Sequence, residues 1–224
     1  MDFHHKIING LEFKSGTGAQ ERMFSFADEN GHKVYIATDF RYEKDGKVKL
    51  TKAYRSFKDW DEFFDAYYPR HMNDWFLYEV IREGTPCRIY WDLDWSLDKW
   101  SEKQVLKEFT GWVKKFFGLK KDDFVTVSGS RKKKGSFHVI SPSYFVSSNT
   151  KLKKWVKKAI TDSGSEIIKG SVDWKIYTKN RLMRICYSRK MEDDGPMLRP
   201  YGYVDFPDTL ITKLGENEKK WKAN

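Results

Sequence analysis

Apolar and polar residues alternate in several short stretches of the amino-terminal part of the chain and then recur at helical spacing. Alternation predicts half-buried strands, and recurrence every three or four residues predicts a helix with one apolar face. The sequence predicts strands over 23–27, 34–38 and 48–51, turns over 28–31 and 45–46, and a helix over 57–68 that Pro69 ends. We expect the polar, glycine-rich residues 1–20 to be irregular, and residues 1–72 to form one αβ module.

The rest of the chain alternates between strand-like and helix-like patterns. It predicts strands over 75–80, 88–93, 124–128, 136–140 and 201–205, an extended piece over 171–174, and helices over 101–118 and 149–163. The first helix begins with a capping-box sequence at Ser101, and Gly118 and Gly164 suit the ends of the two helices. This order predicts an α/β or α+β sheet with helices packed on it. We expect a second module over 73–214 and a mobile charged tail over 215–224.

Composition narrows the class of partner. The chain has 224 residues, with 42 Lys or Arg against 32 Asp or Glu, and a formal net charge of +10 at pH 7. This excess favours a polyanionic partner, and nucleic acid is preferred to a membrane because no apolar run reaches the roughly 18 residues of a spanning helix. Cys87 and Cys186 are the only cysteines, too few for a structural zinc module. With no amino-terminal signal pattern, these features predict a soluble intracellular protein with free thiols.

Two carboxylates, Asp92 and Asp94, lie at the end of the predicted strand 88–93. Because side chains alternate along a strand, both point to the same side. Two like charges held together repel unless a cation or strong hydrogen bonds offset them, so the pair predicts a Mg²⁺ or Mn²⁺ site for phosphate chemistry. The alternative is an exposed acidic turn after a strand.

Three polar side chains, Lys134, Ser136 and His138, follow a basic loop at the same two-residue spacing and would share one face of a strand. A cation, a hydroxyl and an imidazole in this order suit the binding of a phosphate group. The alternative is a core histidine beside a solvated loop. The loop itself, with Arg131, Lys132 and Lys133, is typical of a solvated surface and also of a surface that binds the DNA backbone.

The last cluster of candidate residues lies between 173 and 190. Asp173, in an extended apolar stretch, would complete a three-carboxylate metal site or merely cap a turn. Arg181 and Arg184 suit bidentate phosphate contacts, and their three-residue spacing lets them share a helical face or converge from an irregular segment. Lys190 follows. Arginines exposed on the surface without a ligand are the alternative.

The order of these motifs closely resembles the archaeo-eukaryotic primase superfamily, in its primase-polymerase branch found in eukaryotes and large DNA viruses and related to the herpesvirus primases. The resemblance is carried by Leu-Tyr-Glu-Val at 77–80, Tyr-Trp-Asp-Leu-Asp at 90–94, Lys-Gly-Ser-Phe-His at 134–138 and Val-Asp-Trp-Lys-Ile-Tyr-Thr-Lys-Asn-Arg-Leu-Met-Arg at 172–184. It covers roughly residues 54–190. The family often has Glu where this chain has Asp94, and either residue serves as a metal ligand.

The resemblance implies a fold, a site and a reaction. The fold would be an RRM-like catalytic module packed with the amino-terminal αβ module. Asp92, Asp94 and Asp173 would bind two Mg²⁺ or Mn²⁺ ions, and Lys134, Ser136, His138, Arg181, Arg184 and Lys190 would bind the nucleotide. We expect looser contacts with the sugar or template from Tyr78 and Arg55, and DNA-backbone contacts from Arg131, Lys132 and Lys133 and from the lysine-rich helix over 151–158.

The activity implied is template-dependent nucleotidyl transfer from a dNTP or NTP to a 3′-hydroxyl in DNA replication. The partners would be a single-stranded DNA template and a primer. A replicative helicase or a zinc-binding region, which many relatives carry, would be fused to the chain or supplied separately; the large DNA viruses among these relatives make a viral or phage origin an expectation as well. Two alternatives are a metal-dependent nuclease, which needs no triphosphate site, and a non-catalytic RRM-like nucleic-acid-binding module, which needs no metal.

Overall fold

The computed structural model describes residues 4–8, 11–67, 75–192 and 195–222. They form two compact units, which we describe separately. Unit 1 comprises Met1–Val80 and Leu182–Met197, and unit 2 comprises Ile81–Arg181 and Leu198–Asn224. The chain thus returns to unit 1 at Leu182, between the candidate residues Arg181 and Arg184. The module boundary expected between residues 72 and 73 lies outside the described residues.

Unit 1 contains a sheet with the strand order β1-β2-β4-β3-β5-β9. The strands are β1 His4–Ile8, β2 Leu11–Ser15, β3 Val34–Lys44, β4 Lys47–Phe57, β5 Leu77–Ile81 and β9 Arg181–Arg184, and the helices are α1 Ala19–Asn30 and α2 Trp60–Tyr67. The predicted turn at 45–46 is confirmed: Asp45 and Gly46 have φ of 57° and 68°. Two successive positive φ values match the twist of a two-residue hairpin, so the turn fixes the long β3–β4 ladder.

The strand predicted over 23–27 is wrong, because these residues lie in α1. Met23, Phe24 and Ala27 are buried, with Met23 and Phe24 packing against Ala37 and Tyr78 of the sheet. The alternating sequence over 23–27 fits a short strand, but positions i, i+1 and i+4 of the same stretch also lie on one face of a helix. Gly31, with φ 68°, ends the helix rather than turning a hairpin. The start expected to be irregular also contains the paired strands β1 and β2.

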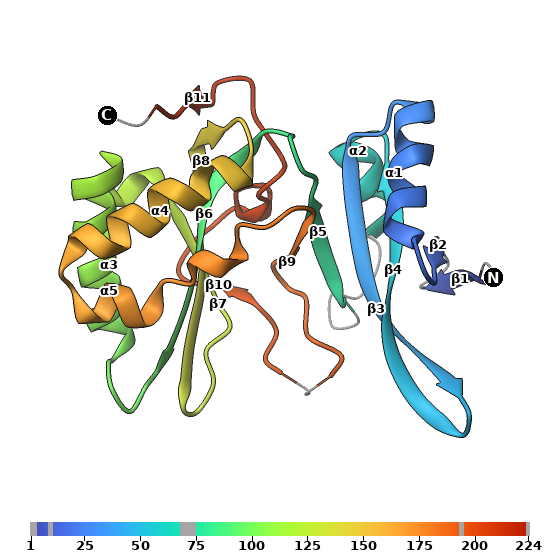
Figure 1. Cartoon of the computed structure of the whole chain (residues 1–224), viewed down its shortest axis with the longest axis horizontal. Helices are drawn as coiled ribbons and strands as arrows, with labels where there is room; N and C mark the ends of the chain where they lie inside the picture. The colour runs from blue at the N-terminus through green and yellow to red at the C-terminus, as the bar shows by residue number, and fades with distance from the viewer. Residues whose placement is uncertain (1–3, 9–10, 68–74, 193–194, 223–224) are drawn as a thin grey trace. The chain divides into compact units, whose positions relative to one another are not determined.

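Unit 2 is built around a second sheet (Figure 1). Its strands are β6 Cys87–Ser96, β7 Val125–Ser128, β8 Lys134–Val146, β10 Arg199–Pro200 and β11 Lys219–Lys220, and its helices are α3 Glu102–Phe117, α4 Asn149–Ser163 and α5 Glu166–Ser171, with the 3₁₀ turns η2 Lys121–Asp123, η3 Trp174–Ile176 and η4 Phe206–Thr209. β8 is central: it pairs antiparallel with β6 and with β7, and parallel with β11. The mixed α+β class predicted from the sequence is confirmed.

Helices α3 and α4 lie on one side of this sheet (Figure 1). The buried ring of Trp91 packs edge-on against Phe109 and Phe117 of α3, with centroids 5.4 and 5.2 Å apart. Trp112 of α3 donates from Nε1 to the Ala159 carbonyl of α4 at 3.0 Å. The predicted capping box at Ser101 is confirmed. This side of the sheet is a core of aromatic rings, which leaves the other side for polar residues.

The strand predicted over 201–205 is wrong. Arg199 and Pro200 pair with β7, the Tyr201 N–H donates to the Thr126 carbonyl at 2.8 Å, and the chain then bends at Gly202, whose φ is +98°. A left-handed φ interrupts extended pairing and is favourable for glycine because it has no Cβ. Tyr201 and Tyr203 therefore flank a bend instead of alternating along a strand.

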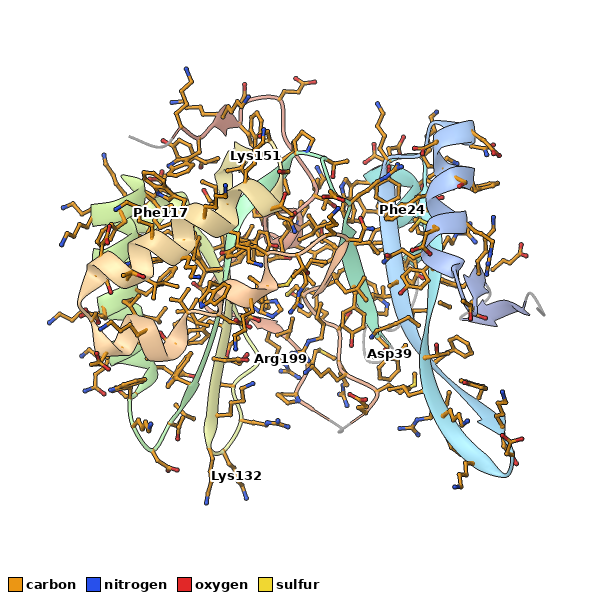
Figure 2. All side chains as sticks on the ribbon, viewed as in Figure 1. Phe24, Asp39, Phe117, Lys132, Lys151 and Arg199 are labelled. Carbon is orange, nitrogen blue, oxygen red and sulfur yellow. The ribbon has the colours of Figure 1, made fainter. Side chains whose placement is uncertain are left out.

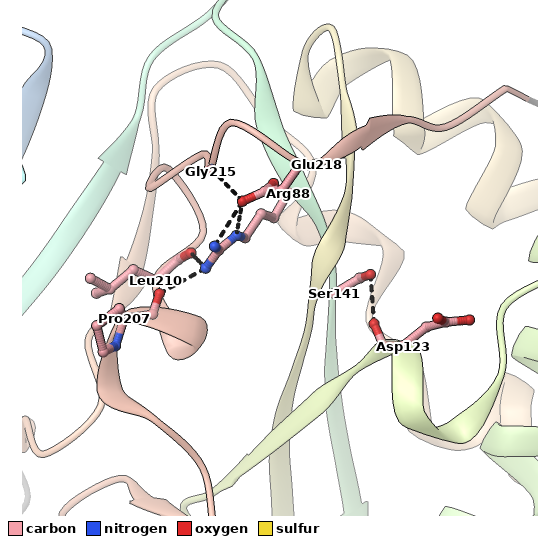
Figure 3. A network of polar contacts seen from close by, with 7 residues as sticks. All are labelled: Arg88, Asp123, Ser141, Pro207, Leu210, Gly215 and Glu218. Atoms are coloured by element: carbon pink, nitrogen blue, oxygen red, sulfur yellow. Dashed lines mark hydrogen bonds and ion pairs between the residues drawn. The ribbon is translucent and has the colours of Figure 1, made fainter.

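Residues 215–224, expected to be a mobile tail, include a segment that packs on unit 2. Arg88, only 4% exposed, donates to Oε1 of Glu218 from Nε and Nη2 at 3.1 and 2.8 Å and to the carbonyls of Pro207 and Leu210 from Nη1 (Figure 3). Trp221 packs on Phe117 and donates to its carbonyl at 3.0 Å. The sequence reasoning missed this anchoring because it rests on contacts with residues more than 100 positions away.

Candidate active site

The register of β6 against β8 brings the two polar motifs together. Asp92 pairs with His138, Asp94 with Ser136 and Ser96 with Lys134. Because paired residues in an antiparallel ladder point to the same side, the two carboxylates, the hydroxyl and the imidazole share one face of the sheet. The neighbouring residues Leu93 and Phe137 are fully buried, as members of the opposite face. Two-residue spacing in each motif is what makes this shared face possible.

Lys134 and His138 both lie close to the carboxylates of this face. Lys134 Nζ donates to Asp94 Oδ2 at 2.8 Å. Both side chains are more than a third exposed, so solvent screens the pair and its net contribution to stability is small. His138 Nε2 lies 3.8 Å from Asp92 Oδ1, within ion-pair range but too far for a hydrogen bond.

Asp173 lies beside β6. Its backbone N–H donates to the Asp92 carbonyl at 2.9 Å, and Val172 forms a bridge with Leu93. Its carboxylate Oδ1 accepts a bond from the Lys175 N–H at 2.8 Å and caps η3. The expectation that Asp173 caps a turn is confirmed, and its place in a three-carboxylate metal site stays a prediction.

The carboxylate of Asp92 has an unfavourable environment for its charge. Burial, followed by repulsion from Asp94 and Asp173, raises the pKa of Asp92 to about 7, while Arg181 and Lys134 act in the opposite direction. Oδ1 of Asp92 and Oδ1 of Asp94 are both buried, and neither has a hydrogen-bond partner within the described part of the chain. Buried oxygens without partners are uncommon in folded proteins, and a bound water or ion would satisfy them.

A divalent cation suits these oxygens, since Mg²⁺ and Mn²⁺ prefer carboxylate ligands. However, among the residues that the structure describes, no three His, Cys, Asp or Glu side chains form a group arranged to hold a metal ion. The donors therefore fit in kind, but the three-carboxylate set is not assembled.

The predicted phosphate-binding residues at 181–190 fall in different units. Arg181 belongs to unit 2 and stabilises the charge of Asp92, whereas Arg184 and Lys190 belong to unit 1. Arg181 and Arg184 are the ends of β9, where a three-residue spacing places side chains on opposite faces. The shared helical face considered for them is therefore wrong. Arg184 Nη1 donates to the Pro196 carbonyl at 3.2 Å.

In unit 1, Tyr78 is part of a polar cluster with the buried Asp39 and the half-buried Lys52. The Tyr78 hydroxyl donates to Asp39 Oδ2 at 2.8 Å, Lys52 forms an ion pair with Asp39, and Lys52 Nζ lies 3.5 Å from the centre of the Tyr78 ring. Burial and the neighbouring Asp39 raise the pKa of Tyr78. The charges of Arg184 and Lys190 also act on this cluster.

The sequence reasoning missed Asp39, which is only 3% exposed. The signal was present: counting outward from the confirmed turn at 45–46 pairs Asp39 directly with Lys52. Arg55, also in unit 1, donates from Nη1 to the Glu12 carbonyl at 3.3 Å and stacks over the Phe57 ring.

The basic residues Arg131, Lys132 and Lys133 form the tight turn between β7 and β8, and all three are exposed. The turn is closed by backbone bonds between Arg131 and Lys134 at 2.8 and 3.0 Å. Figure 2 shows the Lys132 side chain projecting from its tip. On α4, Lys153 and Lys157 lie over the Trp174 ring, at 5.6 and 4.8 Å from its centre.

Comparison of the chain with models of known protein families gives no match, and comparison with curated protein sequences gives none either. None of the helices in the described ranges combines the length and the apolar character needed to cross a membrane. The functional assignment therefore rests on the motifs and on the geometry of the site.

Proposed function

We propose that this chain is a primase-polymerase catalytic domain that transfers a nucleotide from a dNTP or NTP to a 3′-hydroxyl, directed by a single-stranded DNA template. The observation that carries the proposal is the pairing of β6 with β8, which sets Asp92 and Asp94 beside Ser136 and His138. A triphosphate site and a carboxylate pair on one face are what nucleotidyl transfer requires. The α+β class is compatible with the RRM-like catalytic module that the resemblance implies.

Asp92, Asp94 and Asp173 would hold two Mg²⁺ or Mn²⁺ ions. When bound, the ions would supply activation of the attacking hydroxyl and neutralisation of the charge on the triphosphate and the leaving pyrophosphate. The buried, partnerless oxygens of Asp92 and Asp94 support this assignment. Asp173 would join them through its second carboxylate oxygen, since Oδ1 accepts the bond from the Lys175 N–H.

The residues on β8 would bind and orient the triphosphate. Lys134 would exchange its exposed pair with Asp94 for a phosphate oxygen, at little cost because solvent already screens that pair. The Ser136 hydroxyl and the His138 imidazole would add directional hydrogen bonds, and Arg181 would balance charge beside Asp92. Positioning and charge balance of this kind supply most of the catalysis in phosphoryl transfer.

Arg184, Lys190, Tyr78 and Arg55 enter the proposal through the resemblance. Arg184 and Lys190 would bind the nucleotide's phosphates, and Tyr78 and Arg55 would contact the sugar or the template. The exposed turn of Arg131, Lys132 and Lys133 would contact the DNA backbone, so that contact would weaken as the salt concentration rises.

The decisive experiment is extension of a primed single-stranded template with Mg²⁺ or Mn²⁺ and each class of nucleotide. Asp92→Asn should reduce extension at least about a thousandfold, as expected when transition-state stabilisation of about 4 kcal/mol is lost. Asp98→Asn, an exposed carboxylate after the same strand, is the matched control and should extend normally. The proposal is refuted if a folded Asp92→Asn protein extends the primer at the wild-type rate. Cleavage of DNA without added nucleotides would favour a nuclease.

A second measurement tests the triphosphate site. His138→Ala should weaken binding of a nucleoside triphosphate by about tenfold, the value of one charge-assisted hydrogen bond, while binding of template DNA changes little. The reverse pattern would place His138 on the template side and contradict the assignment.

A further inference from the structure

Unit 2 has a hollow away from the carboxylates. It has a volume of about 760 Å³ and lies between α3, η2, β7 and the bend that follows β10. Its charged and aromatic lining residues include Lys103, Lys107, Lys121, Asp122, Tyr201 and Tyr203. This volume is within the range of about 300–1,000 Å³ that is typical of ligand sites. We name it the tyrosine groove.

The tyrosine groove is separate from the candidate active site because it lies on the other face of the sheet. Tyr201 packs edge-on against Phe137, with ring centroids 5.2 Å apart. Phe137 stands between Ser136 and His138 in β8, so its side chain points to the opposite side from theirs. A molecule in the groove would therefore not touch Asp92 or Asp94.

Two tyrosine rings are presented to solvent at the groove. Tyr203 is 97% exposed and Tyr201 46%, both well above the exposure of a packed aromatic side chain. Gly202 between them has φ +98°, so the chain bends between the two tyrosines. Single exposed aromatic residues are common, but two beside one hollow form a stacking surface.

The charges around the groove are mostly positive. Lys103 and Lys107 stand one turn apart on α3, and Lys121 opens η2. Within the described residues none of these three lysines forms an ion pair, and Asp122 is the only acid among the residues that line the groove. Unpaired cations around aromatic rings are the combination that binds single-stranded nucleic acid, with phosphates on the lysines and bases on the rings.

We propose that the tyrosine groove binds single-stranded nucleic acid, with bases stacked on Tyr201 and Tyr203 and phosphates held by Lys103, Lys107 and Lys121. The nucleic acid here would be a strand outside the reaction centre, such as the single-stranded continuation of a template. The inference does not require the chain to be a polymerase, since the groove is separate from the carboxylates. An acidic peptide would use the lysines but gain nothing from stacking.

The test measures binding of a fluorescent oligothymidylate of about 12 nucleotides in EDTA, without nucleotides, so that no reaction at Asp92 contributes. Tyr203→Ala, which removes an almost fully exposed ring, should raise Kd at least about fivefold. Lys103→Gln with Lys107→Gln should lower the slope of log K against log salt by about 1.4, or 0.7 for each lost phosphate contact. Lys114→Gln with Lys115→Gln, exposed on the same helix and outside the groove, is the charge-matched control and should leave Kd within about twofold.

A second measurement tests whether the bound nucleic acid lies at Tyr201 and Tyr203. Photocrosslinking an oligonucleotide that contains 5-bromouracil should attach it to the peptide that includes Tyr201 and Tyr203. The proposal is overturned if Tyr203→Ala and the lysine pair both bind like the control. It is overturned equally if a polyglutamate peptide binds as well as DNA and ignores Tyr203→Ala. If the protein does not extend a template but these binding effects are observed, the proposed polymerase activity is refuted and the proposal for the tyrosine groove still holds.

Discussion

Replacing Asp92 by Asn should change how the stability of the metal-free protein depends on pH. The pKa of Asp92 is raised from 3.8 to about 7, mainly by burial. A folded-state pKa above the unfolded one means that folding favours the protonated carboxyl. Its contribution to stability is therefore fully present below about pH 4 and is lost as the pH rises to about 7. At about 1.36 kcal/mol per pKa unit, the full loss is about 4 kcal/mol.

Asn cannot ionise, so Asp92→Asn should escape this loss. The difference in unfolding free energy between Asp92→Asn and wild type should grow by about 2–3 kcal/mol between about pH 5 and pH 8. The assay is urea unfolding in EDTA, followed by tryptophan fluorescence at several pH values. Using the difference between the two proteins removes the titrating groups that do not interact with Asp92, and leaves Asp92 together with its coupling to Asp94 and Asp173. A difference that stays constant within about 0.5 kcal/mol over this range would refute the reasoning from burial.

A divalent cation should reverse the penalty at high pH. A ligand that binds only the folded state stabilises it by about 2.7 kcal/mol at a hundred times its Kd. Mg²⁺ or Mn²⁺ should therefore stabilise wild type and Asp98→Asn at about pH 8, and Asp92→Asn much less. Equal stabilisation of all three proteins would mean that the cation binds elsewhere.

Two further predictions concern stability. Arg88→Met should lower the unfolding free energy by about 3–5 kcal/mol, measured by urea unfolding, because Glu218 would remain buried without its partner; adding Glu218→Leu should restore part of the loss, and no restoration would contradict this cause. Gly135→Ala should lower the melting temperature, at a cost of about 1–3 kcal/mol, because a Cβ there would overlap the Trp95 ring. Gly111→Ala, with open space around it inside α3, should instead stabilise by about 0.5–1 kcal/mol; equal effects at both glycines would show that Trp95 does not matter.

The parts of the fold that could be predicted are those fixed by local geometry. The capping box at Ser101 and the turn at 45–46 each need only a few neighbouring residues and their own hydrogen bonds. The same holds for the shared face of Asp92 and Asp94, which follows from the two-residue period of any strand. The placement of His138 opposite Asp92 needed one more fact, the register of two strands more than 40 residues apart, which only packing decides.

The parts that could not be predicted depend on contacts distant in sequence. Over 23–27 a window of five residues fits a strand and a helix equally, and the sheet face beneath Met23 decides for the helix. Over 201–205 the alternation was real, but the φ of Gly202 overrode it. The division that puts Arg181 in one unit and Arg184 in the other has no local signal at all.

A comparison of three acidic residues within the structure singles out Asp92. Asp39 is buried and has an ion pair with Lys52 and a bond from Tyr78; Glu218 is buried and accepts three hydrogen bonds from Arg88 and Gly215 at one of its oxygens. Oδ1 of Asp92 accepts no hydrogen bond in the described part of the chain, and the His138 ring nitrogen Nε2 is 3.8 Å away from it. Since an unpaired buried charge costs several kcal/mol, a cation at Asp92 Oδ1 would stabilise the folded protein more than one at the oxygens of Asp39 and Glu218 that already have cationic partners.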